Sequence, residues 1–399
     1  MAITNFQPQY DNSYEEVFLK KPIYAELANM RYESKLAYGT SVERFFYDIS
    51  NVLVRSTIRG SASTIDTVTD GNELLTINLE KELVFHISDG ERTQAGPLNP
   101  AEVIGAKVAE KMVVDLDARF LAEVRNALFS FDTGSLTTSA ANGTPIVLST
   151  TTVPQMIARM AAFIKSKNNV ELTRPVLVID AIGLSDVAQY ALSKNIDMAG
   201  QIFSNGFTNK QVGGADIYTT ENLTAEGVGT ASGTFSNTET VTIGGTVFTM
   251  VSAIGATAGN VLIGANAAAS LTNLTAAINN PATTSATQIA LSAADQVNLI
   301  QTLKVSAIAT ATTVSLVAIG AGRGLTLSET GANFAWGTAW VNAYFGQKGA
   351  IDMVVQDISK VDMRKTSDRR GTNIFNSYLA GIKTYSDGAK MFTNVKIAI

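Results

Sequence analysis

The chain has 399 residues, enough for two or three domains that each bury a core. Its net charge of −5 and its 16 % of charged residues argue against a surface for binding nucleic acid, which needs clustered Lys and Arg. The absence of cysteine excludes disulfides, thiolate metal sites and cysteine catalysis. The single histidine, His86, cannot form a histidine metal cluster, and we expect it on the polar face of a strand.

We expect neither a secretion signal nor a membrane span. Residues 1–8 lack a basic region followed by an apolar core. The stretch between Glu239 and Asp295 carries no charge, but Gly, Thr, Asn and Ser interrupt it throughout. It therefore contains no apolar run of the ~18 residues that a membrane helix needs.

Apolar and polar residues alternate over the 13 residues from Leu75 to Ile87. The apolar side comprises Leu75, Ile77, Leu79, Leu83, Phe85 and Ile87. A period of two predicts one long strand, which would span ~43 Å at ~3.3 Å per residue. Residues 88–96 then break the pattern as a polar hinge.

A long helix is predicted to follow the hinge. Asn99 is a suitable N-cap, Pro100 occupies the first helical position, and Glu102 follows three residues after the cap. Apolar residues then recur every four positions from Ile104 to Leu128. This helix would be ~48 Å long at 1.5 Å per residue. A strand and a helix of this length predict a subunit that reaches out to touch others.

The chain beyond the helix divides by composition. Residues 224–345 contain six charged residues in 122, and their hydrophobicity argues against disorder. Within them we predict a hairpin around Gly244-Gly245, strands at 260–264, 312–317 and 325–327, and a helix over 268–278. Outside them we predict helices at 153–167 and 184–192, and strands at 176–179, 348–357, 374–385 and 395–397. The charge-poor segment is therefore interpreted as a small, mostly β module inserted into a host domain.

No catalytic constellation is predicted. The glycines of residues 320–324 lack the Gly-Lys-Ser/Thr ending of a phosphate loop and indicate a turn. Asp115 and Asp117 are two apart on a helix, so they lie on different faces and do not form an acid/base pair. Asp115 belongs instead to an i,i+4 ladder of Lys111, Asp115, Arg119 and Glu123 on a solvated face. We expect no catalytic residue, cofactor or metal.

Residues 360–371 form a basic, turn-rich stretch with three open interpretations. It could be a solubilising loop, a docking site for acids of another subunit, or a nucleic-acid contact. The net charge and the lack of interleaved aromatic residues disfavour the third. The docking interpretation pairs the acids Glu73, Glu80, Glu82, Asp89 and Glu91 with the bases Arg364, Lys365, Arg369 and Arg370.

Residues 69–89, with 91–94 behind them, resemble the major capsid proteins of tailed phages with the Hong Kong 97 fold. The likeness lies in the order of a Thr-Asp turn, a long alternating strand and an acidic hinge into a long helix. Residues 174–195 and 205–223, with glycines 206, 213 and 214, resemble the start of the axial domain. The resemblance implies an α+β fold with six parts. They are an N-terminal arm (1–38), an extended loop (39–96), the spine helix and peripheral domain (97–173), the axial domain (174–223 and 339–359), an inserted α+β domain (224–338) and peripheral-domain return strands (360–399).

The function implied by the resemblance is structural. The chain would be the major capsid subunit of a phage virion, assembling in the bacterial host cytoplasm into hexamers and pentamers of an icosahedral head. That shell would enclose dsDNA without sequence-specific binding and would meet portal, scaffolding and decoration proteins. The inserted domain would brace neighbours or decorate the outer surface. Two alternatives stay open: an encapsulin-like nanocompartment shell, and a phage tail or surface structural protein.

Overall fold

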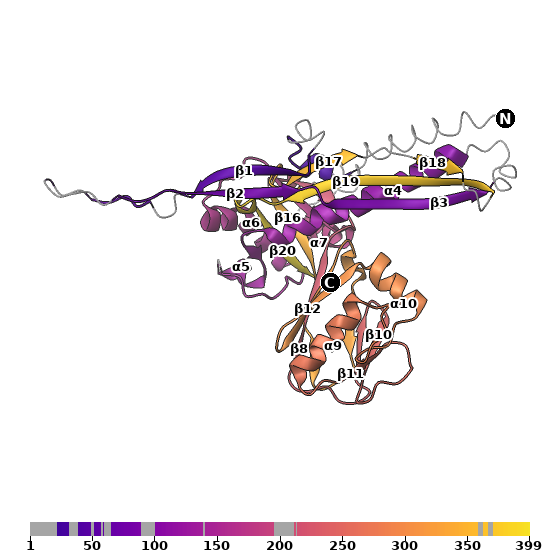
Figure 1. The fold of residues 1–399 in the computed structure, drawn as a ribbon. Coiled ribbons are helices and arrows are strands. Elements are labelled where there is room, and N and C mark those ends of the chain that lie inside the picture. Colours follow the sequence, from indigo (N-terminus) through magenta and orange to yellow (C-terminus); the bar gives the residue numbers. More distant parts are fainter. Residues whose placement is uncertain are drawn as a thin grey trace. The chain divides into compact units, whose positions relative to one another are not determined.

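The computed structural model describes residues 22–31, 39–48, 52–56, 59, 65–88, 100–138, 140–194, 211–212, 214–357, 362–365 and 370–399. The chain divides into two compact units, and the division falls within the helix that begins at Pro100. The first unit contains residues 28–109 and 351–385, and the second contains 110–350 and 386–399 with a short piece that ends at Leu27. Helices and sheets occur together (Figure 1), so the predicted α+β class is confirmed.

The first unit contains a two-stranded arm. Strands β1 (Ser41–Asp48) and β2 (Thr69–Thr76) pair antiparallel, with Ser41 opposite Thr76 and Asp48 opposite Thr69. Among the described residues no third strand joins this sheet (Figure 1). Both strands of the arm lie within residues 39–96, the range that the resemblance assigns to the extended loop.

A second sheet of the first unit is built around β19 (Gly371–Lys383), the longest of the described strands. Strand β3 (Leu79–Ser88) pairs with residues 371–380 along one edge. On the other edge, β18 (Asp362–Lys365) and β17 (Asp352–Asp357) pair with opposite ends of β19. The predicted strand over 374–385 is thus confirmed and is longer at its start.

The prediction of one strand from Leu75 to Ile87 is wrong, because the chain changes sheets between Thr76 and Leu79. Leu75 and Ile77 are both buried in a cluster with Val354 and Tyr385. At this crossing the backbone passes close to Gly381 of β19, where a Cβ would lie 2.8 Å from the Thr76 carbonyl oxygen. Alternation indicates extended backbone but does not say which strand it pairs with.

Helix α4 (Pro100–Ala122) is shorter than predicted, at 23 residues or ~35 Å. A 3₁₀ turn, η3 (Glu123–Asn126), follows it, and the backbone leaves helical geometry at Ala127. The apolar pattern continues to Leu128, but that residue is exposed. Residues 130 and 131 form a short strand instead, β4 (Ser130–Phe131), which pairs in parallel with the C-terminal strand. The predicted N-cap Asn99 lies outside the described residues.

The second unit is organised around β16 (Trp340–Gln347), whose first seven residues are buried. It is the middle of a ten-stranded sheet ordered β12-β13-β8-β16-β5-β7-β6, to which β20, β4 and β15 also belong. On one edge β16 pairs with β20 (Phe392–Ala398), and on the other it pairs first with β8 (Ala225–Ala231) and then with β5 (Pro175–Ile179). The remaining strands of the sheet are β6 (Gln211–Val212), β7 (Ala215–Thr219), β12 (Val305–Ala309), β13 (Thr313–Ala318) and β15 (Phe334–Trp336).

Helices complete the second unit outside the charge-poor segment. The predicted helices at 153–167 and 184–192 are confirmed as α6 (Thr152–Asn168) and α7 (Ala181–Lys194). The short elements are α2 (Tyr24–Leu27), α5 (Thr133–Thr137) and η6 (Gly388–Lys390).

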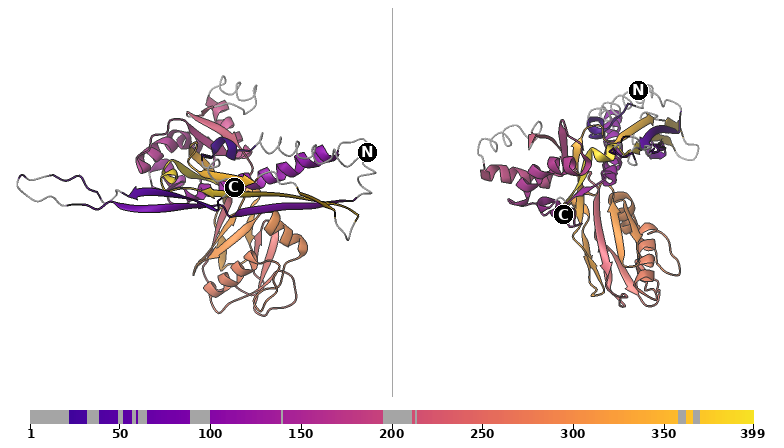
Figure 2. Two further views of the ribbon diagram at one scale, coloured as in Figure 1. Left: turned by 45° about the horizontal axis from the view of Figure 1, so that its top comes forward. Right: turned by 90° about the vertical axis from the view of Figure 1, so that its left-hand side faces the viewer.

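The charge-poor segment contributes strands to two sheets. Its predicted hairpin is confirmed as β9 (Thr240–Ile243) and β10 (Thr246–Val251), and both turn glycines have positive φ, as a two-residue type I′ turn requires. These strands form a four-stranded sheet with β11 (Asn260–Leu262) and β14 (Leu327–Glu329). Helix α9 (Ala267–Asn279) packs against β11, β12 and β13 (Figure 2, right). The other helical turns are α10 (Ala293–Val297), η4 (Asn298–Thr302) and η5 (Gly322–Gly324).

Candidate interaction surfaces

Asp115 and Asp117, the two neighbouring aspartates of α4, each bind a different structural partner. Asp115 accepts from Arg119 Nε at 2.9 Å and also pairs with Lys304, so the predicted ladder is linked to the charge-poor segment and is not simply a solvated face. Asp117 accepts the backbone N–H groups of Ile23 and Tyr24. The two aspartates therefore serve different neighbours, as their spacing predicts.

Within the described ranges, no cluster of three or more Asp, Glu or His side chains could hold a metal ion. The glycines of residues 320–324 form a turn whose Gly322 N–H donates to the Leu223 carbonyl oxygen. None of the helices described is both long and apolar enough to cross a membrane.

The β1–β2 arm exposes a row of large apolar side chains. Phe45 is 71 % exposed and Ile65 is 89 % exposed. The full set is Phe45, Phe46, Val52, Leu53, Val54, Ile65, Val68 and Leu74. Large apolar side chains that are exposed in such number mark a candidate site of protein interaction, and the edges of a two-stranded sheet are templates for further pairing.

Polar contacts hold the arm together at its far end and at its base. Asp66 accepts from Arg55 Nη1 at 2.6 Å and from the Leu53 N–H at 3.0 Å, and these donors, Arg55 first, hold the pKa of Asp66 below its ordinary value. At the base, the Arg44 guanidinium lies 5.1 Å from the centre of the Tyr385 ring. Leu75 and Ile77, which are buried in a cluster with Tyr385, also anchor the base of the arm, while its outer part stays exposed.

The predicted acidic contact residues fall on two different strands. Glu73 is on β2, opposite Arg44 of β1 in the strand register. Glu80 and Glu82 are exposed on β3, where they face Leu379 and Ser377 of β19 in the register. Asp89 and Glu91 lie outside the described residues. The five acids thus do not form one continuous row on a single strand.

The predicted basic contact residues surround the start of β19. Arg364 and Lys365 are on β18, and Arg370 directly precedes β19. Arg364 and Arg370 are exposed, and the Arg364 guanidinium lies 5.5 Å from the centre of the Phe375 ring. Arg369 lies outside the described residues. The described bases and the acids of β3 therefore flank opposite edges of the same strand.

His86 lies in the same sheet. Its Nδ1 is 2.7 Å from Oδ1 of Asn373, the residue opposite it on β19. Arg364 is opposite Asn373 on the other side. Arg364, Asn373 and His86 thus form one row across the sheet, which confirms a strand position for His86 and adds a partner that sequence reasoning missed.

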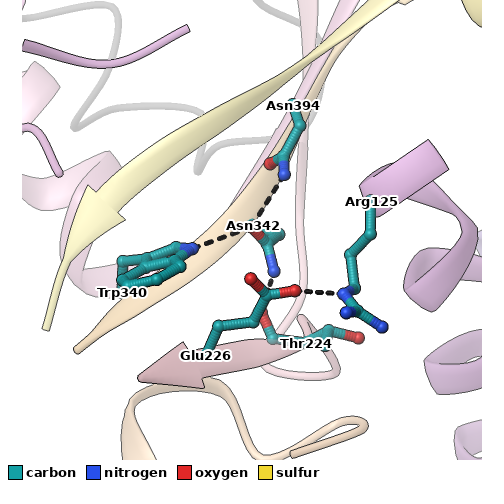
Figure 3. Close-up of polar contacts among 6 residues, drawn as sticks. All are labelled: Arg125, Thr224, Glu226, Trp340, Asn342 and Asn394. Carbon is teal, nitrogen blue, oxygen red and sulfur yellow. Dashed lines mark hydrogen bonds and ion pairs between the residues drawn. The ribbon is translucent and has the colours of Figure 1, made fainter. Parts of the chain in front are cut away.

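A buried amide cluster joins strands of the second unit (Figure 3). Asn342 of β16 accepts at Oδ1 from Trp340 Nε1 at 3.1 Å and from Asn394 Nδ2 at 2.9 Å. Its own Nδ2 donates to the Thr224 carbonyl oxygen at 3.3 Å. Beside it, Arg125 of η3 pairs with Glu226 of β8. Both polar atoms of the Asn342 side chain thus have partners, and these bonds connect β16, β20 and the residue before β8, which suits a structural joint.

Comparison with known proteins finds similarity between this chain and several solved structures. No protein-family model matches the chain, and no curated protein matches it. A solved structure of Mycobacterium phage Che8 is 15 % identical, with 94 % of this chain and 90 % of that chain covered and a TM-score of 0.47. The capsid of cyanophage P-SCSP1u is 12 % identical, with 95 % and 89 % covered and a TM-score of 0.46. A virus-like particle from Pyrococcus furiosus is 9 % identical, with 97 % and 98 % covered and a TM-score of 0.40.

Proposed function

We propose that the chain is the structural subunit of an icosahedral shell of the tailed-phage type, built from many copies of itself. The observation that carries the proposal is the β1–β2 arm, which has two strands, a buried anchor and a row of exposed apolar side chains. A two-stranded hairpin is marginally stable alone in water. An arm of this kind gains stability when a neighbour covers it.

The energy available from covering the arm is substantial. Burying one exposed Phe, Val, Leu or Ile side chain stabilises by about 1.5–3 kcal/mol. The arm offers eight such side chains, so burial of half of them would contribute up to about 6–12 kcal/mol, which is comparable to the cost of association. Identical subunits that each carry one arm and one receiving surface associate through a heterologous interface, which gives closed rings when the rotation between neighbours closes.

Charge pairing between copies is the second part of the proposal. Arg364, Lys365, Arg369 and Arg370 of one copy would meet Glu73, Glu80, Glu82, Asp89 and Glu91 of another. The exposure of Arg370, Glu80 and Glu82 supports this pairing, because a neighbouring subunit could reach each of these side chains. Complementary charges of this type set the register of an interface more than its strength.

The contents and partners of the shell follow from the resemblance to capsid proteins. Hexamers and pentamers would close a phage head around dsDNA in the host cytoplasm, with portal, scaffolding and decoration proteins as further partners. The net charge of −5 suits holding DNA by enclosure rather than by tight binding. A shell that holds protein cargo in place of DNA would favour the encapsulin-like alternative.

Electron microscopy of the purified protein tests the proposal. We expect closed shells or capsomers from the natural chain, and folded, unassembled subunits from Phe45→Glu. Ile308→Glu is the matched control, because Ile308 is equally exposed at 71 % but lies on β12 in the other unit. Soluble monomers or tubes from the natural chain would contradict the proposal.

A further inference from the structure

The charges of the charge-poor segment are few, and three of its six pair with the host. These pairs are Glu226 with Arg125, Lys304 with Asp115, and Arg323 with Asp180. All three host residues belong to the second unit and lie on α4, on η3 and just after β5. Charge is therefore concentrated where the segment meets the host.

The Arg323–Asp180 pair is the most buried of the three. Asp180 is fully buried, and its Oδ2 accepts from Arg323 Nε at 2.5 Å and from the Gly183 N–H at 3.1 Å. Arg323 also donates from Nη1 to the Ala398 carbonyl oxygen at 3.2 Å. A buried carboxylate is costly without a cation beside it, so Asp180 depends on an arginine from the segment.

Helix α4 receives a second attachment. Lys304 pairs with Asp115, and both side chains are largely buried. Three residues further along the helix from Asp115, in the adjacent turn, Ala118 packs against Gly320, where an added Cβ would lie 2.6 Å from the Ala118 Cβ. Gly320 has a φ of 71°, so glycine is favoured there by conformation as well as by space.

The third attachment lies beside the buried amide cluster (Figure 3). Glu226 of β8 pairs with Arg125 of η3, and Glu226 is also opposite Trp340 in the β8–β16 register. The Thr224 carbonyl oxygen accepts from both the backbone N–H and the side chain of Asn342. Backbone pairing, an amide cluster and an ion pair therefore meet where the segment leaves the host sheet.

Two of the other charges are used inside the segment. Glu239 accepts from the Ser236 N–H at 2.9 Å, and Asp295 accepts from Ser292 Oγ at 2.6 Å at the start of α10. The sixth, Glu329, lies on β14. Each ion pair described for the segment thus joins one of its residues to the host, and none joins two residues of the segment.

We infer that residues 224–338 are fixed to the host part of the second unit by a three-point ionic clamp, Lys304–Asp115, Glu226–Arg125 and Arg323–Asp180, and move with residues 110–122 as one rigid body. Lost pairs should loosen the joint between segment and host before they unfold either. This inference does not depend on the proposed function, because all three pairs lie within one chain.

Hydrogen–deuterium exchange of the full-length chain, read by mass spectrometry, tests the clamp. We expect Arg125→Glu and Glu226→Arg, taken singly, to speed exchange in β8 and in residues 319–324 by about tenfold, as the loss of a charge-assisted bond predicts. The double variant should restore slow exchange. Lys165→Met is the matched control, because the exposed Lys165–Glu171 pair at 3.2 Å lies wholly within the host.

The milder variant Lys304→Met provides a second test, which still applies if a charge-reversal variant does not fold. We expect it to speed exchange in residues 319–324 and to leave exchange in α6 unchanged. Unchanged exchange at the joint in Lys304→Met, or a double variant as fast as either single one, overturns the clamp.

Discussion

Tyr24 donates its backbone N–H to Oδ1 of Asp117 at 3.0 Å, although 93 residues separate the two in the chain. Ile23 donates to the other oxygen at 3.2 Å. Burial raises the pKa of Asp117 from 3.8 to about 6, and the two backbone hydrogen bonds only partly oppose this effect. The residues that lead into α2 are therefore held by a carboxyl group that titrates in a mildly acidic range.

Asp117 makes stability fall as pH rises from about 4 to about 6. The folded state holds the proton more tightly than the unfolded state, so its contribution is full below the unfolded pKa and is lost as pH passes the folded pKa. The difference between the two pKa values corresponds to about 3 kcal/mol. We expect the free energy of unfolding of Asp117→Asn, relative to the natural chain, to improve by up to this amount between pH 4 and pH 7. Denaturant unfolding at several pH values measures it, and a flat difference contradicts the assignment.

Gly381 is predicted to be essential where the chain crosses from β2 to β3. A Cβ there would lie 2.8 Å from the Thr76 carbonyl oxygen and 2.9 Å from a Leu75 methyl group. We expect Gly381→Ala to lower the free energy of unfolding by about 1–3 kcal/mol, as overpacking does. Gly255→Ala is the control, since its nearest atom would be at an ordinary 3.6 Å. Equal thermal unfolding of the two variants would show that the crossing is not tightly packed.

Asn342 is predicted to tolerate apolar replacement poorly. Asn342→Leu removes the acceptor of Trp340 Nε1 and Asn394 Nδ2, both in buried side chains. Leaving buried donors unsatisfied costs about 1–3 kcal/mol each. Asn126→Ala serves for comparison, because its bond to Glu123 is exposed. The account fails if thermal denaturation ranks the two variants equally.

The boundary of the charge-poor segment gives a matched pair of deletions. Composition alone extends the segment to Phe345, but residues 340–347 form β16, the strand that pairs with β5, β8 and β20. We expect deletion of 224–338 with a short linker to leave a folded but weakened host, since Asp115 and Asp180 lose a cation. Deletion of 224–345 should unfold it. Circular dichroism and limited proteolysis distinguish the two outcomes, and a folded product of the longer deletion would show that β16 is dispensable.

Local patterns predicted local elements well. Helix α6, strand β5 and the Gly244-Gly245 hairpin follow from periodicity and turn chemistry, because neighbours in sequence decide them. Periodicity did not predict that the strand breaks at Ile77. The break is set by packing against Val354 and Tyr385, which lie almost 300 residues away in the chain. No alternation or turn signal marks such a contact.

The candidate site divides in the same way. An acidic and basic pairing can be proposed from residue order, and the resemblance to capsid proteins implies an extended loop over 39–96; both stay predictions. The clamp could not be predicted, because Arg323 and Asp180 are 143 residues apart and each looks like an ordinary surface charge in sequence. The available signal was the rarity of charged residues in 224–345, since charged residues that occur at so few positions tend each to make a specific contact.

The central claim is that the arm of one copy lies on another copy. Since the chain has no cysteine, Val54→Cys gives a single attachment point, at a residue that is fully exposed in the arm. Assembled particles labelled there with a photoactivated cross-linker should yield chains joined to each other, with the partner peptide identified by mass spectrometry. The account predicts cross-links between chains in particles and their loss in Phe45→Glu. Cross-links only within single chains, in particles that have assembled normally, would contradict it.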